Sequence, residues 1–151
     1  MTPVIRRARA ADQADITALV REARLNPRGL HWSRFLVADD DGRIVGVAQV
    51  RLHSDGAREL ASLVVKPEYR GQGLAGHLID GLVSGDHGRM HMLVDRPFAD
   101  YYQRWGFHPT NPRSLPGSMS RQYRIGRVVT SIGSLILRRR IRIVPLERAG
   151  H

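Results

Sequence analysis

The sequence predicts a single α/β (α+β) domain in which strand-like and helix-like segments alternate along the chain. Two observations support this prediction. Short β-rich apolar runs are followed by segments whose apolar residues recur at helical spacing. A glycine-rich turn at residues 70–75 also joins a strand-like run at residues 60–65 to a helix-like run at residues 74–83. At 151 residues, the chain is long enough to bury one hydrophobic core without disulfides or metals.

The N-terminal part of the chain is predicted to form a strand, a helix and a β-hairpin. The helix has four apolar residues at the spacing of one helical face, and an Asn-Pro pair stops it. The hairpin turns at an Asp-Gly pair, which suits a tight connection between two strands. The expected elements are a strand at residues 4–9, a helix at 11–24, strands at 34–38 and 44–52, and a turn at 54–57.

The middle of the chain continues the alternation. A strand at residues 59–65 leads into the glycine-rich turn, and a helix at residues 73–83 follows it. A strand at residues 90–95 and a short helix at residues 98–105, ended by Gly106, come next. Residues 109–117 contain three prolines and are expected to form a loop.

The C-terminal part allows two interpretations. Apolar residues between positions 125 and 136 recur at helical spacing and favour an amphipathic helix over residues 118–137. Gly126 and Gly133 each cost such a helix roughly 1 kcal/mol, and a β-hairpin turning at residues 131–134 is the alternative. Residues 140–146 alternate arginine with apolar residues and are predicted to form a final strand.

Positive charge is concentrated near the C-terminus. Nine arginines follow residue 112, where Glu147 is the single acidic residue, so most of the formal net charge of +10 belongs to this quarter of the chain. Such a segment can meet an anionic partner or can be a solvated face. We do not expect nucleic acid as the partner.

The composition also limits the chemistry and the location. The sequence has no cysteine, which excludes disulfides, thiolate metal sites and an acyl-cysteine intermediate. No segment reaches the ~18 apolar residues of a membrane span, and no signal-like apolar run follows the N-terminal arginines. A cytoplasmic protein is therefore expected.

The glycine-rich turn is the clearest functional signal. A turn of this kind that enters a helix leaves backbone N–H groups unpaired at the positive end of the helix dipole, where a phosphate can bind. Residues 71–76 also fit the dinucleotide pattern G-x-G-x-x-G, with Asp95 after the next strand. However, five residues separate Val65 from Gly71, whereas the dinucleotide motif turns almost directly off its strand. A pyrophosphate outside a Rossmann fold is the favoured interpretation.

The segment Arg70-x-x-Gly73-x-Ala75 resembles the acyl-CoA pyrophosphate loop of the GNAT superfamily of N-acetyltransferases. A second motif, Tyr102-x-x-x-Gly106-Phe107, lies at the distance that this family shows, and the resemblance covers about residues 3–108. It implies a mixed, strongly bent central sheet with helices on both faces. Acetyl-CoA would lie where the strands at residues 59–65 and 90–95 splay apart.

The resemblance implies a cofactor site made largely of backbone. Backbone N–H groups of the loop would hold the pyrophosphate, and the lack of a Cβ on the glycines would let the backbone approach the phosphate oxygens. Arg70 would add a charge-assisted contact, and the last residues of the preceding strand would pair with the pantetheine amides. The expected cofactor-binding residues are Leu63, Val64, Val65, Arg70, Gly71, Gln72, Gly73, Leu74 and Ala75.

Acyl transfer to an amine needs a group that takes a proton and a group that gives one. By its place in the second motif, Tyr102 resembles the family's general acid, and Tyr101 is about 100° away around a helix. Glu59 opens the signature strand, and strand alternation puts it on the same side as Ala61, Leu63 and Val65. We expect Glu59 to be the base, with pairing to Arg58 or Arg51 as its structural alternative, and Asp95 as a weaker acceptor or cofactor contact.

The predicted function is transfer of an acetyl group from acetyl-CoA to a primary amine by direct attack, with no metal and no covalent acyl-enzyme. The seven histidines show no metal-ligand spacing, and His77 and His91 are expected to be structural. A non-catalytic acyl-CoA-binding module that docks on an anionic partner through the basic helix is the alternative.

The resemblance fades after His108, so the acceptor remains unassigned at this point. The divergent segment at residues 109–137 is expected to wall the acceptor pocket or to make a homodimer contact. The acceptor would be a small molecule or a peptide, and a basic wall containing Arg121, Arg124 and Arg127 favours one that carries a carboxylate.

Overall fold

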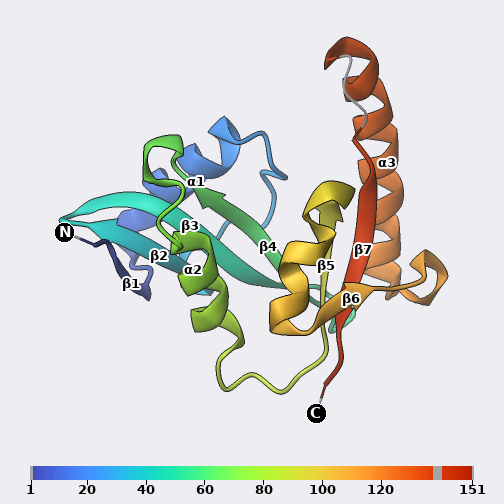
Figure 1. Cartoon of the computed structure of the whole chain (residues 1–151), viewed down its shortest axis with the longest axis horizontal. Coiled ribbons are helices and arrows are strands. Elements are labelled where there is room, and N and C mark those ends of the chain that lie inside the picture. Colours follow the sequence, from blue (N-terminus) through green and yellow to red (C-terminus); the bar gives the residue numbers. More distant parts are fainter. Residues whose placement is uncertain (1, 138–140, 151) are drawn as a thin grey trace. The chain divides into compact units, whose positions relative to one another are not determined.

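The computed structural model describes residues 2–137 and 141–150, apart from the side chains of residues 128–137. Seven strands form one mixed sheet with the hydrogen-bonded order β1-β2-β3-β4-β5-β7-β6 (Figure 1). The strands are β1 (Val4–Arg7), β2 (Phe35–Asp40), β3 (Arg43–Leu52), β4 (Arg58–Val65), β5 (Met90–Asp95), β6 (Phe107–Pro109) and β7 (Ile143–Arg148).

Three α-helices and five short 3-10 segments complete the described secondary structure. The α-helices are α1 (Gln13–Glu22), α2 (Leu74–Val83) and α3 (Gly117–Leu137). The 3-10 segments are η1 (Ala10–Asp12), η2 (Trp32–Arg34), η3 (Pro67–Tyr69), η4 (Arg96–Trp105) and η5 (Pro112–Ser114). No helix of the described residues is long and apolar enough to cross a membrane.

The chain divides into two compact units. Unit 1 comprises Met1–Arg51 and Leu60–Asp86, and unit 2 comprises Leu52–Glu59 and His87–His151. The strand β4 therefore begins in unit 2 and continues in unit 1. The expectation of a single domain stays a prediction.

In unit 1, helices cover both faces of the strand layer (Figure 1). The antiparallel pairs β1–β2 and β2–β3 send alternate side chains to opposite faces. Ile16 of α1 packs with Phe35 and Val37 on one face. Leu74 of α2 packs with Ala38 on the other face. The apolar stripes of both helices are therefore buried against one layer of strands, which forms the core of this unit.

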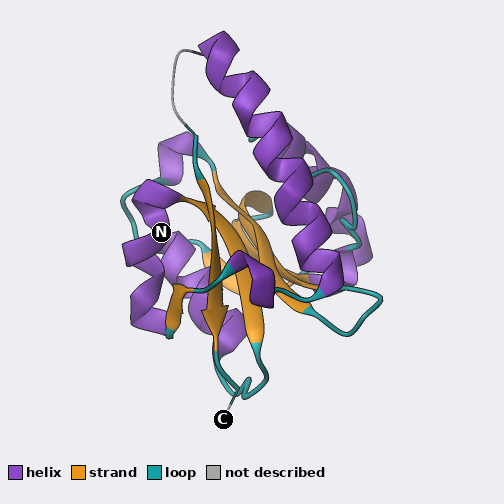
Figure 2. Ribbon diagram, turned by 90° about the vertical axis from the view of Figure 1, so that its right-hand side faces the viewer, coloured by secondary structure: helices purple, strands orange, loops and turns teal. Residues whose placement is uncertain are grey.

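In unit 2, β5 and β6 flank β7, and both pair with it in antiparallel orientation. At its other edge, β5 pairs in parallel with β4, with Glu59 opposite His91. The long helix α3 runs beside this strand layer (Figure 2). Met119 of α3 is fully buried and packs with Ala57, Leu115, Leu93 and Tyr123. This cluster fixes the first half of α3 in unit 2.

Most expected elements are confirmed within a few residues, and the helical interpretation of residues 118–137 is correct, since α3 spans Gly117–Leu137. Two expectations need correction. The segment at residues 109–117 is not all loop, because it contains Pro109, the end of β6, and then η5. The short helix before Gly106 is a 3-10 helix and starts earlier, at Arg96. A three-residue strand such as β6 is too short to show a period, and it exists because it pairs with β7.

Candidate functional site

The glycine-rich loop lies in unit 1 and leads into α2. Gly71 and Gly73 have φ angles of 80° and 78°, a conformation that glycine adopts freely and that other residues rarely adopt. Gly73 is the N-cap residue of α2 and offers no side-chain cap. The N–H groups of the first turn, beginning at Leu74, therefore lack intrahelical partners. An exposed turn of this kind can hold a phosphate group.

The side chains of the loop divide into an exposed group and an anchoring group. Arg70 and Gln72 are exposed, whereas Leu74 is 1% exposed and lies in a core cluster with Ala38. The Nε–H of Arg70 donates to the carbonyl oxygen of Val65 at 3.3 Å, which folds the guanidinium over the end of β4. Ala75, in the first turn of α2, is half-buried. Leu74 thus anchors the loop while the backbone of its glycines faces solvent.

The strand β4 is irregular at Ser62, whereas the sequence predicts regular strand alternation. Ser62 has a φ of 56°, in the left-handed region, and its hydroxyl accepts a hydrogen bond from Nε2 of Gln49 at 2.9 Å. Val64 is buried, while Leu63 and Val65 are half-buried. A residue in this conformation interrupts strand alternation. The inference that Glu59 shares a side with Ala61, Leu63 and Val65 therefore does not hold as argued, because it assumed a regular strand.

Glu59 is a buried carboxylate that contacts the side chains of His53 and Gln122 within unit 2. Its Oε1 lies 3.0 Å from Nε2 of His53, and its Oε2 accepts a hydrogen bond from Nε2 of Gln122 at 2.8 Å. The residue is 4% exposed. A buried carboxylate that accepts hydrogen bonds on both oxygens is fixed in one orientation.

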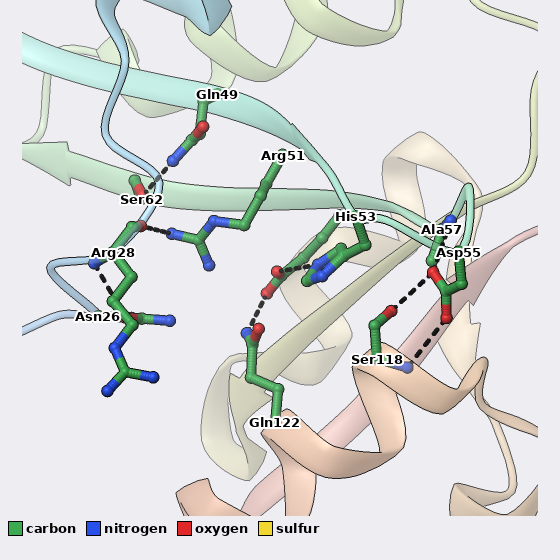
Figure 3. Close-up of polar contacts among 11 residues, drawn as sticks. Asn26, Arg28, Gln49, Arg51, His53, Asp55, Ala57, Ser62, Ser118 and Gln122 are labelled. Atoms are coloured by element: carbon green, nitrogen blue, oxygen red, sulfur yellow. Dashed lines mark hydrogen bonds and ion pairs between the residues drawn. The ribbon is translucent and has the colours of Figure 1, made fainter.

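The helix α3 brings Gln122 to this position. Asp55, in the turn before β4, accepts hydrogen bonds from the backbone N–H of Ser118 at 2.9 Å and from its hydroxyl at 2.8 Å (Figure 3). Asp55 also accepts a hydrogen bond from the Ala57 N–H at 3.1 Å. The bonds from the Ser118 N–H and then the Ala57 N–H are the largest causes that lower the pKa of Asp55 to about 2. A carboxylate at the first turn of a helix also interacts favourably with the positive end of the helix dipole. The turn therefore ties the start of α3 to the segment that carries Glu59.

Tyr102 lies in η4 within an aromatic cluster. Its ring meets the ring of Tyr101 edge to face at a centroid distance of 5.2 Å, and the ring of Trp105 is 6.3 Å away. Burial, and to a smaller extent Tyr101, raises the pKa of Tyr102 to about 12. Tyr101 is 40% exposed, whereas Tyr102 is half-buried. Of the two tyrosines, Tyr102 has the more buried side chain.

His91 and Asp95, the other residues considered for the site, are surrounded by contacts within the fold. His91 is buried, and its Nδ1 has no hydrogen-bond partner among the described atoms. Burial lowers the pKa of His91, with Glu147 opposing that shift. Oδ1 of Asp95 accepts a hydrogen bond from the Arg142 N–H at 3.1 Å. Among residues 2–137 and 141–150, no group of three or more His, Asp or Glu side chains is placed to hold a metal ion.

Sequence reasoning missed His53 and Gln122. In the hairpin, the N–H of His53 donates to the carbonyl oxygen of Ala57, so Glu59 lies two residues beyond the residue that faces His53. Side chains at this diagonal offset can reach each other across a hairpin, and this register is the signal that could have identified His53. Gln122 is 63 residues from Glu59 in the sequence. No local pattern points to that contact, since it depends on how α3 docks.

Comparisons with known proteins give a family match and several structural likenesses. The family model described as an acetyltransferase (GNAT) domain matches residues 31–109. No curated protein matches the chain.

Three solved structures illustrate the likeness in fold. N-acetylglutamate synthase from Neisseria gonorrhoeae, complexed with coenzyme A and N-acetyl-glutamate, has a TM-score of 0.75 and 21% identity; the match covers 100% of this chain and 36% of the synthase. Rv2747 from Mycobacterium tuberculosis, in complex with CoA and NLQ, has a TM-score of 0.69 and 23% identity, covering 97% and 99%. Ard1 from Thermoplasma volcanium has a TM-score of 0.65 and 14% identity, covering 100% and 99%.

Proposed function

Because the chain belongs to the GNAT acetyltransferase family, we propose that it transfers an acetyl group from acetyl-CoA to the primary amine of an acceptor. The observation that carries the proposal is the strand–loop–helix at β4, residues 70–73 and α2, inside the matched region. Its two glycines with positive φ open a helix with free N–H groups, as a pyrophosphate site requires. Coenzyme A in the complexes of structural neighbours supports the same donor.

The chemistry transfers the acetyl group directly. The neutral amine attacks the thioester carbonyl carbon, so that the N–C bond forms as the C–S bond breaks and coenzyme A leaves as a thiolate. For each amide formed, the ammonium form of the acceptor releases one proton to solvent, and a second proton moves from nitrogen to sulfur. The chain has no cysteine, so its own thiol cannot carry the acetyl group.

Glu59 is proposed to take the first of these protons, the one that the ammonium form of the acceptor loses before the attack, directly or through one water. Each of its two oxygens takes part in a hydrogen bond, and a carboxylate offers about four acceptor sites in all. His53 and Gln122 act in this proposal as positioning residues that hold the carboxylate in one orientation. A base fixed before the substrate arrives does not need to reorganise during the reaction.

Tyr102 is proposed to donate a hydrogen bond to the departing sulfur. A thiol has an ordinary pKa near ~8.5, whereas the pKa of Tyr102 is raised to about 12. Complete proton transfer from this phenol to a thiolate is therefore uphill. The phenol stabilises the developing thiolate by hydrogen bonding and keeps its own proton, and the second proton from the nitrogen reaches the sulfur through solvent.

A thiol-release assay over a panel of primary amines tests the proposal. We expect acetyl-CoA-dependent turnover with at least one amine and a loss of about 10²-fold or more in kcat for Glu59→Gln, which keeps the shape but removes the basic oxygen. Glu68→Gln, on an exposed surface ion pair with Arg43, serves as the control and should retain activity. Binding of acetyl-CoA without turnover of any amine would contradict the proposal.

A further inference from the structure

Unit 2 contains a cavity of about 900 Å³ beside β7. Its wall is formed by η4, by Pro109 at the end of β6, by α3, and by residues 141–144, which lead into β7. The volume lies within the range of small-molecule sites, roughly 300–1,000 Å³. Alanine, proline, isoleucine and valine side chains supply an apolar lining, so the cavity can take the carbon skeleton of a small organic molecule.

The charged part of the lining is mainly positive. Among the described lining residues, the charged ones are Arg96, Arg127 and Arg142 against the carboxylate of Asp100. Arginine stays protonated at every physiological pH and presents a planar fork that matches a carboxylate. The cavity therefore favours a ligand with more negative than positive charge, while Asp100 leaves a place for one cationic amine.

The arginines project from an organised frame. The N–H of Arg96 donates to the carbonyl oxygen of Arg142 at 2.8 Å, and the N–H of Arg142 donates to Oδ1 of Asp95 at 3.1 Å. The guanidinium carbon of Arg127 lies 5.9 Å from the centre of the Tyr123 ring, which also lines the cavity. Two of the three arginine positions are thus joined through their backbone, and the third lies against an aromatic wall.

Two elements of the cavity wall are connected to the candidate proton-handling groups: η4 carries Tyr102, and α3 carries Gln122, which binds Glu59. In a 3-10 helix residues three apart lie on the same face, so Tyr102 follows Arg96 and Ala99 along one face of η4. In α3, Gln122 binds Glu59, and the next residue, Tyr123, lines the cavity. A molecule in the cavity is therefore flanked by the helix of Tyr102 and by the helix that holds Glu59.

We propose that this cavity binds the acceptor, and that the acceptor is an amine carrying at least two carboxylates. The inference rests on the proposed acetyltransferase function and names its substrate class. It also distinguishes among the arginines of α3, Arg121, Arg124 and Arg127, which the sequence predicts to form one basic wall. Arg127 lines the cavity, whereas Arg121 and Arg124 are not among its described lining residues.

The test compares amine pairs of matched size, aspartate with asparagine and glutamate with glutamine, in the thiol-release assay. We expect the wild-type protein to prefer the member with the additional carboxylate. Arg127→Gln and Arg142→Gln should each raise the KM for that member about tenfold, the effect of losing one charge-assisted hydrogen bond, with no change in the KM for acetyl-CoA. Arg124→Gln, on the same helix, is the matched control and should behave as wild type.

Three kinetic results would overturn the inference. One is equal kcat/KM for both members of each pair in the wild-type protein. Another is an effect of Arg124→Gln that matches the effect of Arg127→Gln. The third is a higher KM for acetyl-CoA in Arg127→Gln or Arg142→Gln than in the wild-type protein, when the same variants show no such difference with acetyl-dephospho-CoA as the donor. In that case the cavity would hold the 3′-phosphate of the donor.

Calorimetry separates failure of this inference from failure of the proposed function. Aspartate and glutamate are titrated into wild type and Arg127→Gln in the presence of coenzyme A. Binding that Arg127→Gln weakens, without turnover of any amine, supports the carboxylate site and contradicts the enzymatic function. Turnover of uncharged amines with no dependence on the three arginines supports the function and overturns the carboxylate site. Absence of binding of both probes to the wild-type protein also overturns it.

Discussion

At the scale of single residues, Tyr102 and Glu59 have complementary environments. The phenol is half-buried among aromatic rings, which favours its neutral form. The carboxylate is buried as well, but it is held by His53 and Gln122. These environments agree with the roles proposed for the two residues, because a protonated phenol can donate a hydrogen bond and a carboxylate in a fixed orientation can accept a proton.

Replacing Tyr102 by Phe should lower kcat between about tenfold and a hundredfold, because one hydrogen bond to the developing thiolate is lost. The KM for acetyl-CoA should stay within about twofold. Since the pKa of Tyr102 is raised to about 12, the phenol keeps its proton throughout the usual assay range. The pH profile of the variant between pH 6 and pH 10 should therefore have the same shape as that of wild type.

The neighbouring tyrosine provides the control for this substitution. Tyr101 is 40% exposed and carries the same phenol one residue away. Tyr101→Phe should leave kcat close to the wild-type value. Equal losses in the two variants, or the disappearance of an alkaline limb in Tyr102→Phe alone, would contradict the role given to Tyr102.

His91 should make the folded protein less stable as the pH falls below about 6.5. Burial lowers the pKa of His91 from that ordinary value, so on acidification the unfolded chain takes up a proton before the folded chain does. Stability is then lost as the pH falls from about 6.5 toward the lowered pKa. Urea unfolding at pH 7.5 and pH 5.5 measures this loss, and His91→Asn should show a smaller loss than wild type. Identical losses in the two proteins would show that another group is responsible.

At the scale of elements, the loop into α2 combines a sequence signal with a specific backbone shape. The signal is the spacing of the glycines, and the shape is the positive φ at Gly71 and Gly73. A Cβ added to Gly71 would meet no heavy atom within 4 Å other than atoms of its two chain neighbours. A substitution there therefore acts through backbone strain and through the space left for a phosphate, and it does not act through packing.

Gly71→Ala should raise the KM for acetyl-CoA about tenfold or more, because the Cβ keeps phosphate oxygens from the backbone. The matched control is Gly42→Ala in the β2–β3 turn. Gly42 also has a positive φ, 92°, and open space around its Cβ position. Both variants should lose about 1 kcal/mol of unfolding free energy from the strain, but only Gly71→Ala should change the KM. Equal KM values in the two variants would contradict a phosphate-binding loop.

The helix α3 shows how one element can serve both packing and the candidate site. Met119 buries its side chain in the core of unit 2, and Ser118 binds Asp55. From this anchor, Gln122 reaches Glu59 and Tyr123 reaches the cavity wall. Apolar periodicity predicts that the helix exists. Periodicity cannot predict which polar side chain meets which partner, because that depends on the docking of the helix.

At the scale of the whole molecule, each unit contains one of the two tryptophans, Trp32 in unit 1 and Trp105 in unit 2. If the chain is a single domain, both should report the same cooperative unfolding transition. Urea unfolding of Trp32→Phe and Trp105→Phe, followed by fluorescence of the remaining tryptophan, should give a midpoint that agrees with the circular dichroism of the same variant. Separate fluorescence and circular dichroism midpoints within one variant would show that the units unfold independently.

The sequence alone determined the alternation of elements, the position of the glycine-rich loop, the family resemblance and the candidate residues Glu59 and Tyr102. These properties are encoded locally, in apolar periods of two and 3.6 and in glycines at positions of positive φ. The family match over residues 31–109 confirms the resemblance. The roles of the individual site residues stay predictions.

Only the tertiary structure decided what surrounds those residues. The left-handed Ser62 changes the alternation of β4, β6 forms through its pairing with β7, and Gln122 meets Glu59 across 63 positions of sequence. Arg127 likewise joins Arg96 and Arg142 in one cavity wall. Such contacts join segments far apart in the chain, and their geometry is set by how helices and strands pack. A local sequence pattern carries no record of that packing.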